Sequence, residues 1–413
     1  MRIGLLTTSF PRFDGDVAGH FVLGFARALA ALGHHIDVLA PEPAIAMQCP
    51  IWPNVDLHWV PYLRPRSAQR SFYGAGVPDN LLHDPLAWLG LTPFCAALAS
   101  ATVARRSGWD AVISHFGLPC GMLAGELRGR LPHLCVMHSA DVHLLARLPG
   151  RSAVARRIAA GADQLIFVTE AHRQRFLDCL PASARTDADR RCHVQPMGIT
   201  LPALVARERA VLRCEIGLTR FTLLTLARLV PIKGLYEALR SVKQRTDIEW
   251  LIAGEGPEHD RLSTLAAQCR FPVRLLGPVH GDHKHALLQA ADAFVMPSRV
   301  LPSGRSEGLP TALLEAMASG LPAIASNVGG IAEVVRHRDT GLLLDPHDPG
   351  ALARSLDQLR SDPALAAMLS TRGRAEALRH DWSTIAPRLD ALLRAQDASS
   401  SPTWGEPAWP KDC

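Results

Sequence analysis

The sequence predicts an α/β protein made of two Rossmann-like domains that face each other across a cleft. Short apolar segments, of the kind that form strands buried on both faces, alternate with helical patterns along the chain. The alternation breaks at PMGITLP (196–202), which has the composition of a linker, and then restarts. The length of 413 residues suits two or three domains rather than one core.

The first half is predicted to form one doubly wound domain over residues 1–200. Its expected strands are RIGLLTTS, HIDVLAP, DAVISHF, HLCVMHS and QLIFVTE. Between the first two lies GHFVLGFARALAALGH, a helical pattern that ends near Gly33. Strand, helix and strand in this order indicate a parallel sheet that is covered on both faces.

The second half repeats this pattern over residues 201–375. Its expected strands are FTLLTLARL, EWLIAGEG, VRLLG, DAFVMPS, PAIAS and GLLLDP. A last helix is expected over 376–396, and the Pro- and Ser-rich tail 397–413 is expected to be disordered. Because ligands of such sheets bind beyond the carboxyl ends of the strands, functional residues should follow strands directly.

Composition narrows the class of protein. Apolar residues make up 48% and charged residues 20%, as in soluble globular proteins. The net charge of +5 suits anionic ligands or an anionic lipid surface, and it is too small for a dedicated nucleic-acid binder. Nine cysteines without Cys-x-x-Cys pairs indicate neither a disulfide framework nor a zinc site. We expect a cytoplasmic protein whose first residues form a strand rather than a signal peptide.

Two carboxylates stand out in SEGLPTALLEAMASG (306–320), which has no other charged residue. Pro310 suits the first position of a helix that stops at Gly320, so Glu307 would lie in the preceding loop and Glu315 inside the helix. Carboxylates accept hydrogen bonds from sugar hydroxyls, and the helix start offers an anion site. Alternatively, Glu307 complements the helix dipole and Glu315 lies on a solvated face.

Two cations follow the first strand of the same domain. Arg228 comes directly after that strand, and Lys233 lies five residues later in a Pro-Ile-Lys-Gly turn. An arginine fork and a lysine point charge together suit a diphosphate. The alternative is an ordinary solvated surface pair.

These residues carry a resemblance to a known family. Arg228, Lys233 and the Glu-x7-Glu spacing of Glu307 and Glu315 resemble the donor site of retaining glycosyltransferases of family 4, the glycosyl transferases of group 1. The same resemblance extends to AGEGPE (253–258), FVMPS (294–298), EGLPTALLEAMASGLPAIASNVGG (307–330) and TGLLLDP (340–346). It implies the GT-B fold, with an acceptor-binding first domain, a donor-binding second domain and no metal or other cofactor.

The resemblance also implies roles. The two cations would hold the donor diphosphate, Glu315 the ribose and Glu307 the donor sugar, while two glycines would let the chain pass close to the nucleotide. The implied donor-binding residues are Arg228, Lys233, Gly254, Gly256, Glu307, Gly308, Leu309 and Glu315. The implied catalytic residues are Glu307, His138, Arg228 and Lys233.

The first domain contributes two further segments. FPRFDGDVAGHF, in which the family often has two adjacent glycines, has Gly15, Asp16 and Gly19 and is expected to approach a phosphate or an acceptor hydroxyl. HSADVH has His138, which matches a histidine that lines the family's active site, and Asp141 as its partner or an acceptor contact. A hydrogen-bonded structural histidine is the alternative. HGDHKH (280–285) is interpreted as a surface helix cap.

The acceptor is the least specified partner. Residues 85–104 carry no charge and are long enough to span a bilayer, yet prolines and a glycine interrupt them. A helix pair packed on a core is expected first, a membrane-surface patch second and a true span third. The flanking cations suit a lipid-linked acceptor at the inner face of a membrane, or simply a solvated rim. They are Arg64, Arg66, Arg70, Arg105 and Arg106.

The resulting hypothesis is transfer of a sugar from a UDP-, GDP- or ADP-sugar to a hydroxyl of a glycan or lipid-linked acceptor, with the anomeric configuration retained. Two other functions stay open. One is a non-catalytic nucleotide-sugar binding protein. The other is a glycoside hydrolase that uses Glu307 and Glu315 and needs no nucleotide.

Overall fold

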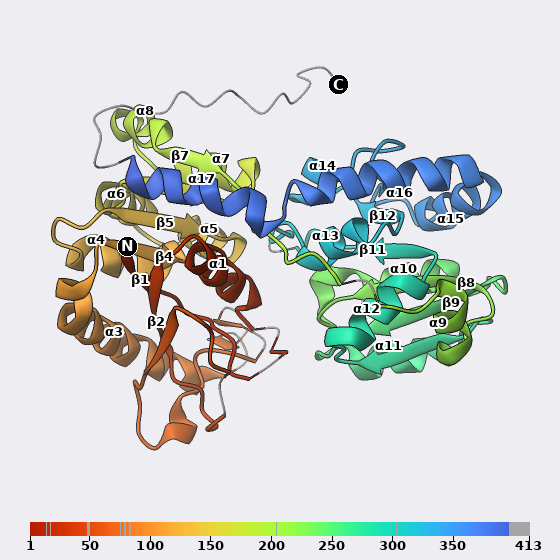
Figure 1. Ribbon diagram of the computed structural model, residues 1–413, viewed down its shortest axis with the longest axis horizontal. Coiled ribbons are helices and arrows are strands. Elements are labelled where there is room, and N and C mark those ends of the chain that lie inside the picture. Colours follow the sequence, from red (N-terminus) through yellow and green to blue (C-terminus); the bar gives the residue numbers. More distant parts are fainter. Residues whose placement is uncertain are drawn as a thin grey trace.

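The computed structural model describes residues 1–395, except 14, 17, 48–49, 75, 78–79, 82–83, 204 and 303. It has two lobes, each built around its own sheet (Figure 1). The predicted two-domain α/β fold is therefore confirmed. The predicted disordered tail, 397–413, lies outside the described residues.

The first sheet has seven parallel strands in the order β3-β2-β1-β4-β5-β6-β7. Its central strands are fully buried because Leu, Ile and Val occupy both faces, as in the Ile3–Ile36 pair. The edge strands β3 and β7 were not among the expected strands. The bounds are β1 (Arg2–Leu6), β2 (His35–Pro41), β3 (Val55–Val60), β4 (Ala111–His115), β5 (His133–Met137), β6 (Gln164–Phe167) and β7 (Cys192–Val194).

Helices cover this sheet and connect its strands. The first helix carries buried apolar residues at helical spacing, including Val22, Phe25 and Leu29. It ends before Gly33, whose φ of +88° favours glycine. The helices are α1 (His20–Ala31), α3 (Leu91–Arg105), α4 (Met122–Leu127), α5 (Ser139–Leu145), α6 (Arg151–Gly161), α7 (Glu170–Leu177) and α8 (Ala182–Arg190).

The second sheet has six parallel strands in the order β10-β9-β8-β11-β12-β13, and Trp250 of β9 is fully buried. Its strands are β8 (Phe221–Leu226), β9 (Ile248–Ala253), β10 (Val273–Gly277), β11 (Ala293–Met296), β12 (Ala323–Ser326) and β13 (Leu342–Leu344). Its helices are α9 (Arg209–Ile216), α10 (Leu235–Val242), α11 (His259–Ala266), α12 (Gly281–Ala290), α13 (Thr311–Ala318), α14 (Ile331–Val334), α15 (Ala351–Ser361) and α16 (Pro363–Leu378).

The chain crosses between the lobes twice, at neighbouring points. The backbone N–H of Trp382 donates to the carbonyl of Ile199 at 3.1 Å, which ties the two crossings together. After the second crossing, α17 (Trp382–Arg394) packs against α1 of the first domain (Figure 1). The Trp382 ring lies 5.9 Å from that of Phe25, edge to face. The last helix thus stabilises the first domain.

The uncharged segment packs one face on the first domain and exposes the other. Within the described residues, Pro85–Gly108 is a helical stretch long and apolar enough to cross a membrane. Phe94 and Leu98 are fully buried, as expected for a helix packed on a core. The short turn Pro85–Gly90 before α3 instead exposes three large apolar side chains, Leu86 (54%), Trp88 (58%) and Leu89 (65%).

Candidate functional site

The two domains meet at the carboxyl ends of their strands. His20 Nε2 lies 3.0 Å from Thr311 Oγ1, and the Ser139 hydroxyl donates to the Ser306 carbonyl at 3.2 Å. A pocket of about 170 Å³ lies between the domains. Its lining includes three residues expected in the site, His138, Gly308 and Leu309, together with His20, Phe21, Val168, Met197 and Thr311.

Glu307 and Lys233 form an ion pair in the second domain. The Lys233 Nζ lies 2.8 Å from Glu307 Oε1, and both side chains are 12% exposed. The buried Ser298 hydroxyl donates to the same oxygen at 3.3 Å. Glu307 has no charged neighbour in its own segment, and folding brings the lysine from the loop after β8 to the loop after β11.

Glu315 also has a cationic partner. It lies on α13 with its side chain 15% exposed, and Lys284 Nζ of α12 is 3.0 Å from its Oε1. The lysine belongs to HGDHKH, and His280 of the same segment lies against Gly15 of the first domain. The segment lies exposed at the start of α12 with His280 at the N-cap, as interpreted, and in addition it adjoins two predicted site residues.

Glycines hold the backbone around Glu307. Gly329 has φ of +54°, and a Cβ there would overlap the Glu307 carbonyl oxygen. The Gly330 N–H donates to the Gly308 carbonyl at 3.1 Å. The family resemblance included this Gly-Gly pair but implied no role for it. Pro310 is the N-cap residue, with ψ of 120°, rather than the first helical residue as expected.

The segment that carries Arg228 packs closely against the two glycines predicted beside the nucleotide. The residues on either side of it, Ala227 and Leu229, donate backbone N–H groups to Ala253 at 3.0 Å and to Glu255 at 2.8 Å. Gly254 and Gly256 have φ of +142° and +154°, and a Cβ on either would overlap a backbone carbonyl of this segment. The close approach that requires glycine is thus to the chain that carries Arg228.

The predicted phosphate loop of the first domain reaches the second domain. Gly15 has φ of +81°, and a Cβ there would be 3.1 Å from the His280 ring. Gly19 precedes α1 with φ of +67° and packs against Ser9. Asp16 is turned toward its own loop, where it accepts from Arg12 Nε at 2.7 Å and from the Ala18 N–H at 3.0 Å. Burial alone would raise the pKa of Asp16, but these bonds outweigh it and lower that pKa.

His138 lies among aromatic rings at the start of α5. Its Nε2 is 3.0 Å from Nδ1 of the buried His115, and the two rings stack. Burial, and then the neighbouring His172, lower the pKa of His138 to about 3. Burial also lowers the pKa of His115. Both rings are therefore neutral near pH 7, and the N–H of one ring donates a hydrogen bond to the bare nitrogen of the other.

Asp141 positions His138. Its carboxylate accepts from the His138 backbone N–H at 2.7 Å and from the Gly117 N–H at 2.5 Å. Burial raises the pKa of Asp141 to about 7, although these backbone bonds oppose the shift. Since both bonds go to the protein, Asp141 serves as the predicted partner of His138 in this arrangement.

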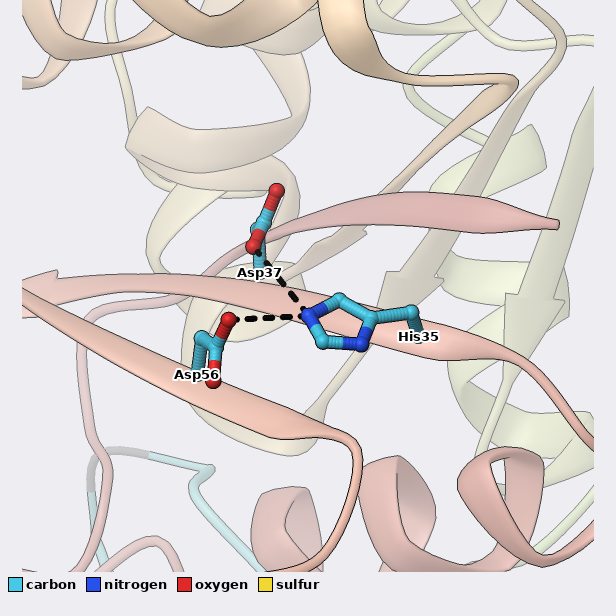
Figure 2. Close-up of side chains that lie close together, drawn as sticks. All are labelled: His35, Asp37 and Asp56. Atoms are coloured by element: carbon cyan, nitrogen blue, oxygen red, sulfur yellow. Dashed lines mark hydrogen bonds and ion pairs between the residues drawn. The ribbon is translucent and has the colours of Figure 1, made fainter.

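Within the described residues, one group has metal-ligand composition and lies away from the cleft, at the amino ends of β2 and β3 (Figure 2). His35 Nε2 is 2.8 Å from Asp56 Oδ2 and 3.9 Å from Asp37 Oδ1. The Arg2 Nε donates to Asp37 at 2.7 Å, and the Trp109 Nε1 donates to it at 2.8 Å. These donors already satisfy the buried Asp37, so we interpret the group as a structural ion cluster.

Glu333 makes a further contact between the domains and carries a pH-dependent prediction. Its carboxylate accepts from the Glu170 N–H at 3.2 Å, and burial raises the pKa of Glu333 to about 7. Above about pH 4.5, the ordinary pKa of a glutamate, the unfolded chain loses this proton, whereas the folded protein keeps it up to about pH 7. The contribution of Glu333 to stability therefore falls as the pH rises from about 4.5 to about 7.

Glu333→Gln should remove this pH dependence. Relative to wild type, we expect the variant to gain up to about 3 kcal/mol in free energy of unfolding between about pH 5 and about pH 8, at about 1.4 kcal/mol per pKa unit. Denaturant unfolding of both proteins at the two pH values measures this. An identical difference at both values would contradict the prediction.

Comparison with known proteins agrees with this geometry. The family model for glycosyl transferases group 1 matches residues 213–376, and the model for a glycosyl transferase 4-like domain matches residues 18–188. A GDP-mannose-dependent alpha-(1-6)-phosphatidylinositol monomannoside mannosyltransferase of Mycobacterium tuberculosis is 34% identical, over 68% of this chain and 74% of its own. The chain belongs to the group 1 glycosyltransferases.

Other similar proteins extend over nearly the whole of this glycosyltransferase. A D-inositol 3-phosphate glycosyltransferase of Xylanimonas cellulosilytica is 30% identical, over 95% of this chain and 97% of its own. Among solved structures, sucrose-phosphate synthase of Thermosynechococcus elongatus has a TM-score of 0.74 at 23% identity and covers 97% of this chain and all of its own. Anabaena HepE with UDP and glucose has a TM-score of 0.69 at 18% identity, covering 96% of this chain and all of its own. The resemblance stated from motifs is thus confirmed, with its GT-B fold.

Proposed function

We propose that this glycosyltransferase transfers a hexose from a nucleotide-sugar with retention of anomeric configuration and without a metal ion. The observation that carries the proposal is the Lys233–Glu307 ion pair, at 2.8 Å, in the loops that follow β8 and β11. Three positive groups that a diphosphate needs come together here: Lys233, Arg228 after the same strand, and the amino end of α13 after the loop that carries Glu307.

The leaving diphosphate is the centre of the proposed chemistry. The bond between the anomeric carbon and the diphosphate oxygen breaks, and Lys233 and Arg228 offset the charge on that oxygen. The acceptor hydroxyl attacks the anomeric carbon from the same face and gives its proton to the departing phosphate. Glu307 accepts hydrogen bonds from the donor sugar. Neutral His138 can form a further hydrogen bond to this sugar through one ring nitrogen.

The ribose would take the place of a lysine. Glu315 is bonded to Lys284 at 3.0 Å in the present arrangement. Two adjacent ribose hydroxyls can bind both oxygens of one carboxylate, and Lys284 is then released toward the nucleotide phosphates. We expect Lys284→Ala to change donor KM more than kcat, because its partner contacts the nucleotide rather than the reacting carbon. Steady-state kinetics over a donor titration measures this, and a pure kcat effect would contradict it.

The similar enzymes guide the choice of substrates. The enzyme of Mycobacterium tuberculosis is named for GDP-mannose and a phosphatidylinositol monomannoside. The enzyme of Xylanimonas cellulosilytica is named for D-inositol 3-phosphate. We therefore propose GDP-mannose as the first donor to test and an acceptor that contains an inositol phosphate unit.

One assay tests the reaction and separates the alternatives. The protein is incubated with UDP-, GDP- and ADP-sugars and candidate acceptors in EDTA, and free nucleoside diphosphate and the anomeric configuration of the product are measured by NMR. We expect one donor to react and its configuration to be kept. Inversion, or activity only with added metal, would contradict the proposal. Binding without turnover would indicate a nucleotide-sugar binding protein.

The hydrolase alternative loses its support. It uses Glu307 and Glu315 as one carboxylate pair and needs no nucleotide, whereas each of them binds a different lysine, at 2.8 and 3.0 Å. The acids therefore belong to two separate ion pairs rather than to one carboxylate pair that flanks a glycosidic bond.

We further propose that the exposed apolar turn at residues 85–90 docks this enzyme on the inner face of a membrane. Leu86, Trp88 and Leu89 are each more than half exposed there, which suits an interfacial contact. Of the five flanking arginines, three have protein partners: Arg66 donates to the Pro43 carbonyl, Arg70 pairs with Asp84, and Arg106 donates to the Leu127 carbonyl. The apolar turn is therefore the stronger basis for the proposal.

Trp88→Ser should weaken binding to anionic vesicles. The matched control is Val211→Ser, which changes a 45% exposed apolar residue of the second domain. Vesicle sedimentation should show a several-fold loss for the first variant and no loss for the second. Equal sedimentation of wild type and Trp88→Ser would contradict the proposal.

A further inference from the structure

His143 has a buried donor without a partner. The Arg175 Nη1 lies 2.9 Å from His143 Nδ1. A guanidinium only donates hydrogen bonds, so this nitrogen accepts and carries no proton. The neutral ring must then carry its proton on Nε2. That atom is buried and has no hydrogen-bond partner in the described part of the chain. An unpaired buried N–H is unfavourable, and an oxyanion would satisfy it.

Three arginines and a second histidine lie near His143. His172 lies on α7 with its ring 5.6 Å from that of His143, edge to face. Burial first, and then the charges of Arg175, Arg147 and Arg305, lower the pKa of His143 to about 4. Three arginines thus act on one buried imidazole. We call His143, His172, Arg147, Arg175 and Arg305 the His143 cluster.

The His143 cluster adjoins the cleft and draws on both domains. His143 lies on the helix that begins beside His138, and His172 lowers the pKa of His138, so the cluster continues directly from the pocket. Arg305 belongs to the second domain and immediately precedes Ser306, whose carbonyl accepts from Ser139 at the start of α5. The cluster therefore lies where the two domains meet.

We propose that the His143 cluster binds a phosphate group of the acceptor, with one phosphate oxygen accepting from His143 Nε2 and the guanidinium of Arg175 binding another. This inference rests on the proposed function, whose acceptor it describes. The donor diphosphate is assigned to Lys233 and Arg228 in the second domain, whereas His143, His172, Arg147 and Arg175 belong to the first domain, where the acceptor is expected. An anion between Arg305 and the arginines of the first domain would also favour domain closure.

Access requires side-chain movement. The Nε2 atom is buried, so a phosphate reaches it only when the groups around it move. Arg147 and Arg175 are exposed, and arginine stems change rotamer readily at a surface. The same guanidinium groups can then close over the bound anion.

A site-resolved titration tests the binding. The His143 imidazole resonance is assigned by its loss in His143→Gln, and inorganic phosphate is added while the NMR shift is followed across pH. We expect a saturable shift and a rise in the pKa of His143, because a bound anion favours the charged ring. Arg175→Gln should abolish the effect. Arg185→Gln, an exposed arginine that pairs with Asp178 at 3.7 Å, should leave it unchanged.

Lys233→Ala separates this site from the donor site. The variant should keep the phosphate response of His143, because the lysine lies in the other site. Absence of any response at His143, or an unchanged response in Arg175→Gln, would overturn the inference. Neither outcome depends on turnover, so the proposed function would stand or fall by its own assay.

Kinetics then tests whether the phosphate belongs to the acceptor. With a phosphorylated acceptor, Arg175→Gln should raise the acceptor KM about 10- to 100-fold, the effect of losing one charged hydrogen bond. Hydrolysis of the donor in the absence of acceptor should not change. Soluble inositol phosphate and phosphatidylinositol vesicles are compared to decide between a free and a lipid-borne phosphate. An unchanged KM for both would show that the cluster does not bind acceptor phosphate.

Discussion

Replacing Lys233 with alanine is expected to lower kcat by at least about 100- to 1000-fold, the typical loss when one group that stabilises a developing anion is removed. The ammonium lies 2.8 Å from Glu307, so the same change also leaves a carboxylate with 12% exposure without its cation. A negative charge would then face the departing diphosphate. Release of nucleoside diphosphate from the reactive donor measures the effect.

Two comparisons make this result specific. Circular dichroism and thermal unfolding should show that Lys233→Ala stays folded, since its side chain does not belong to the packed apolar core of the second domain. Arg185→Gln, an exposed change in the first domain, should keep wild-type turnover. Near-normal turnover of Lys233→Ala would remove this lysine, and with it Glu307, from the proposed site.

Gly254→Ala is expected to cause the largest loss of stability. A Cβ at this position would overlap the Ala227 carbonyl oxygen, and the backbone φ of +142° is unfavourable for alanine. The strand ends of β8 and β9 must separate to relieve the overlap. We expect a loss of more than about 3 kcal/mol in free energy of unfolding, together with weaker donor binding because Arg228 moves.

Gly217→Ala is the matched control for backbone strain. Gly217 has φ of +75° in the same domain, and a Cβ there would have no atom within 4 Å. Its substitution should cost only about 1–2 kcal/mol, the strain of the left-handed conformation. Denaturant unfolding compares the two variants. Equal losses would show that the contact with Ala227 contributes nothing.

The sequence was sufficient for the fold and for the elements that carry the site. Buried parallel strands are continuous apolar segments, so most were recognisable, and Arg228, Lys233 and Glu307 do follow strands as expected. The edge strand β3, VDLHWV, alternates polar and apolar residues and was missed. The packing of α17 on α1 could not be read from the chain, because it depends on the two crossings at Ile199 and Trp382.

The ion pairs within the site could not be predicted from the sequence, for a physical reason. Lys284 and Glu315 are 31 residues apart, and nothing local in HGDHKH distinguishes an ion-pairing lysine from a solvated one. Asp16 could equally have faced a ligand or its own loop, and only the structure shows that it binds Arg12. The Gly329-Gly330 pair carried a usable signal, since adjacent glycines often mark a close backbone approach.

We propose that a nucleotide diphosphate binds between Lys233, Arg228 and the amino end of α13. A crystal structure with the nucleoside diphosphate of the reactive donor would test this claim. We predict that Lys233 and Arg228 contact the phosphates, while Glu315 exchanges Lys284 for the ribose hydroxyls. A nucleotide bound elsewhere, with the Lys233–Glu307 and Lys284–Glu315 ion pairs unchanged, would contradict the claim.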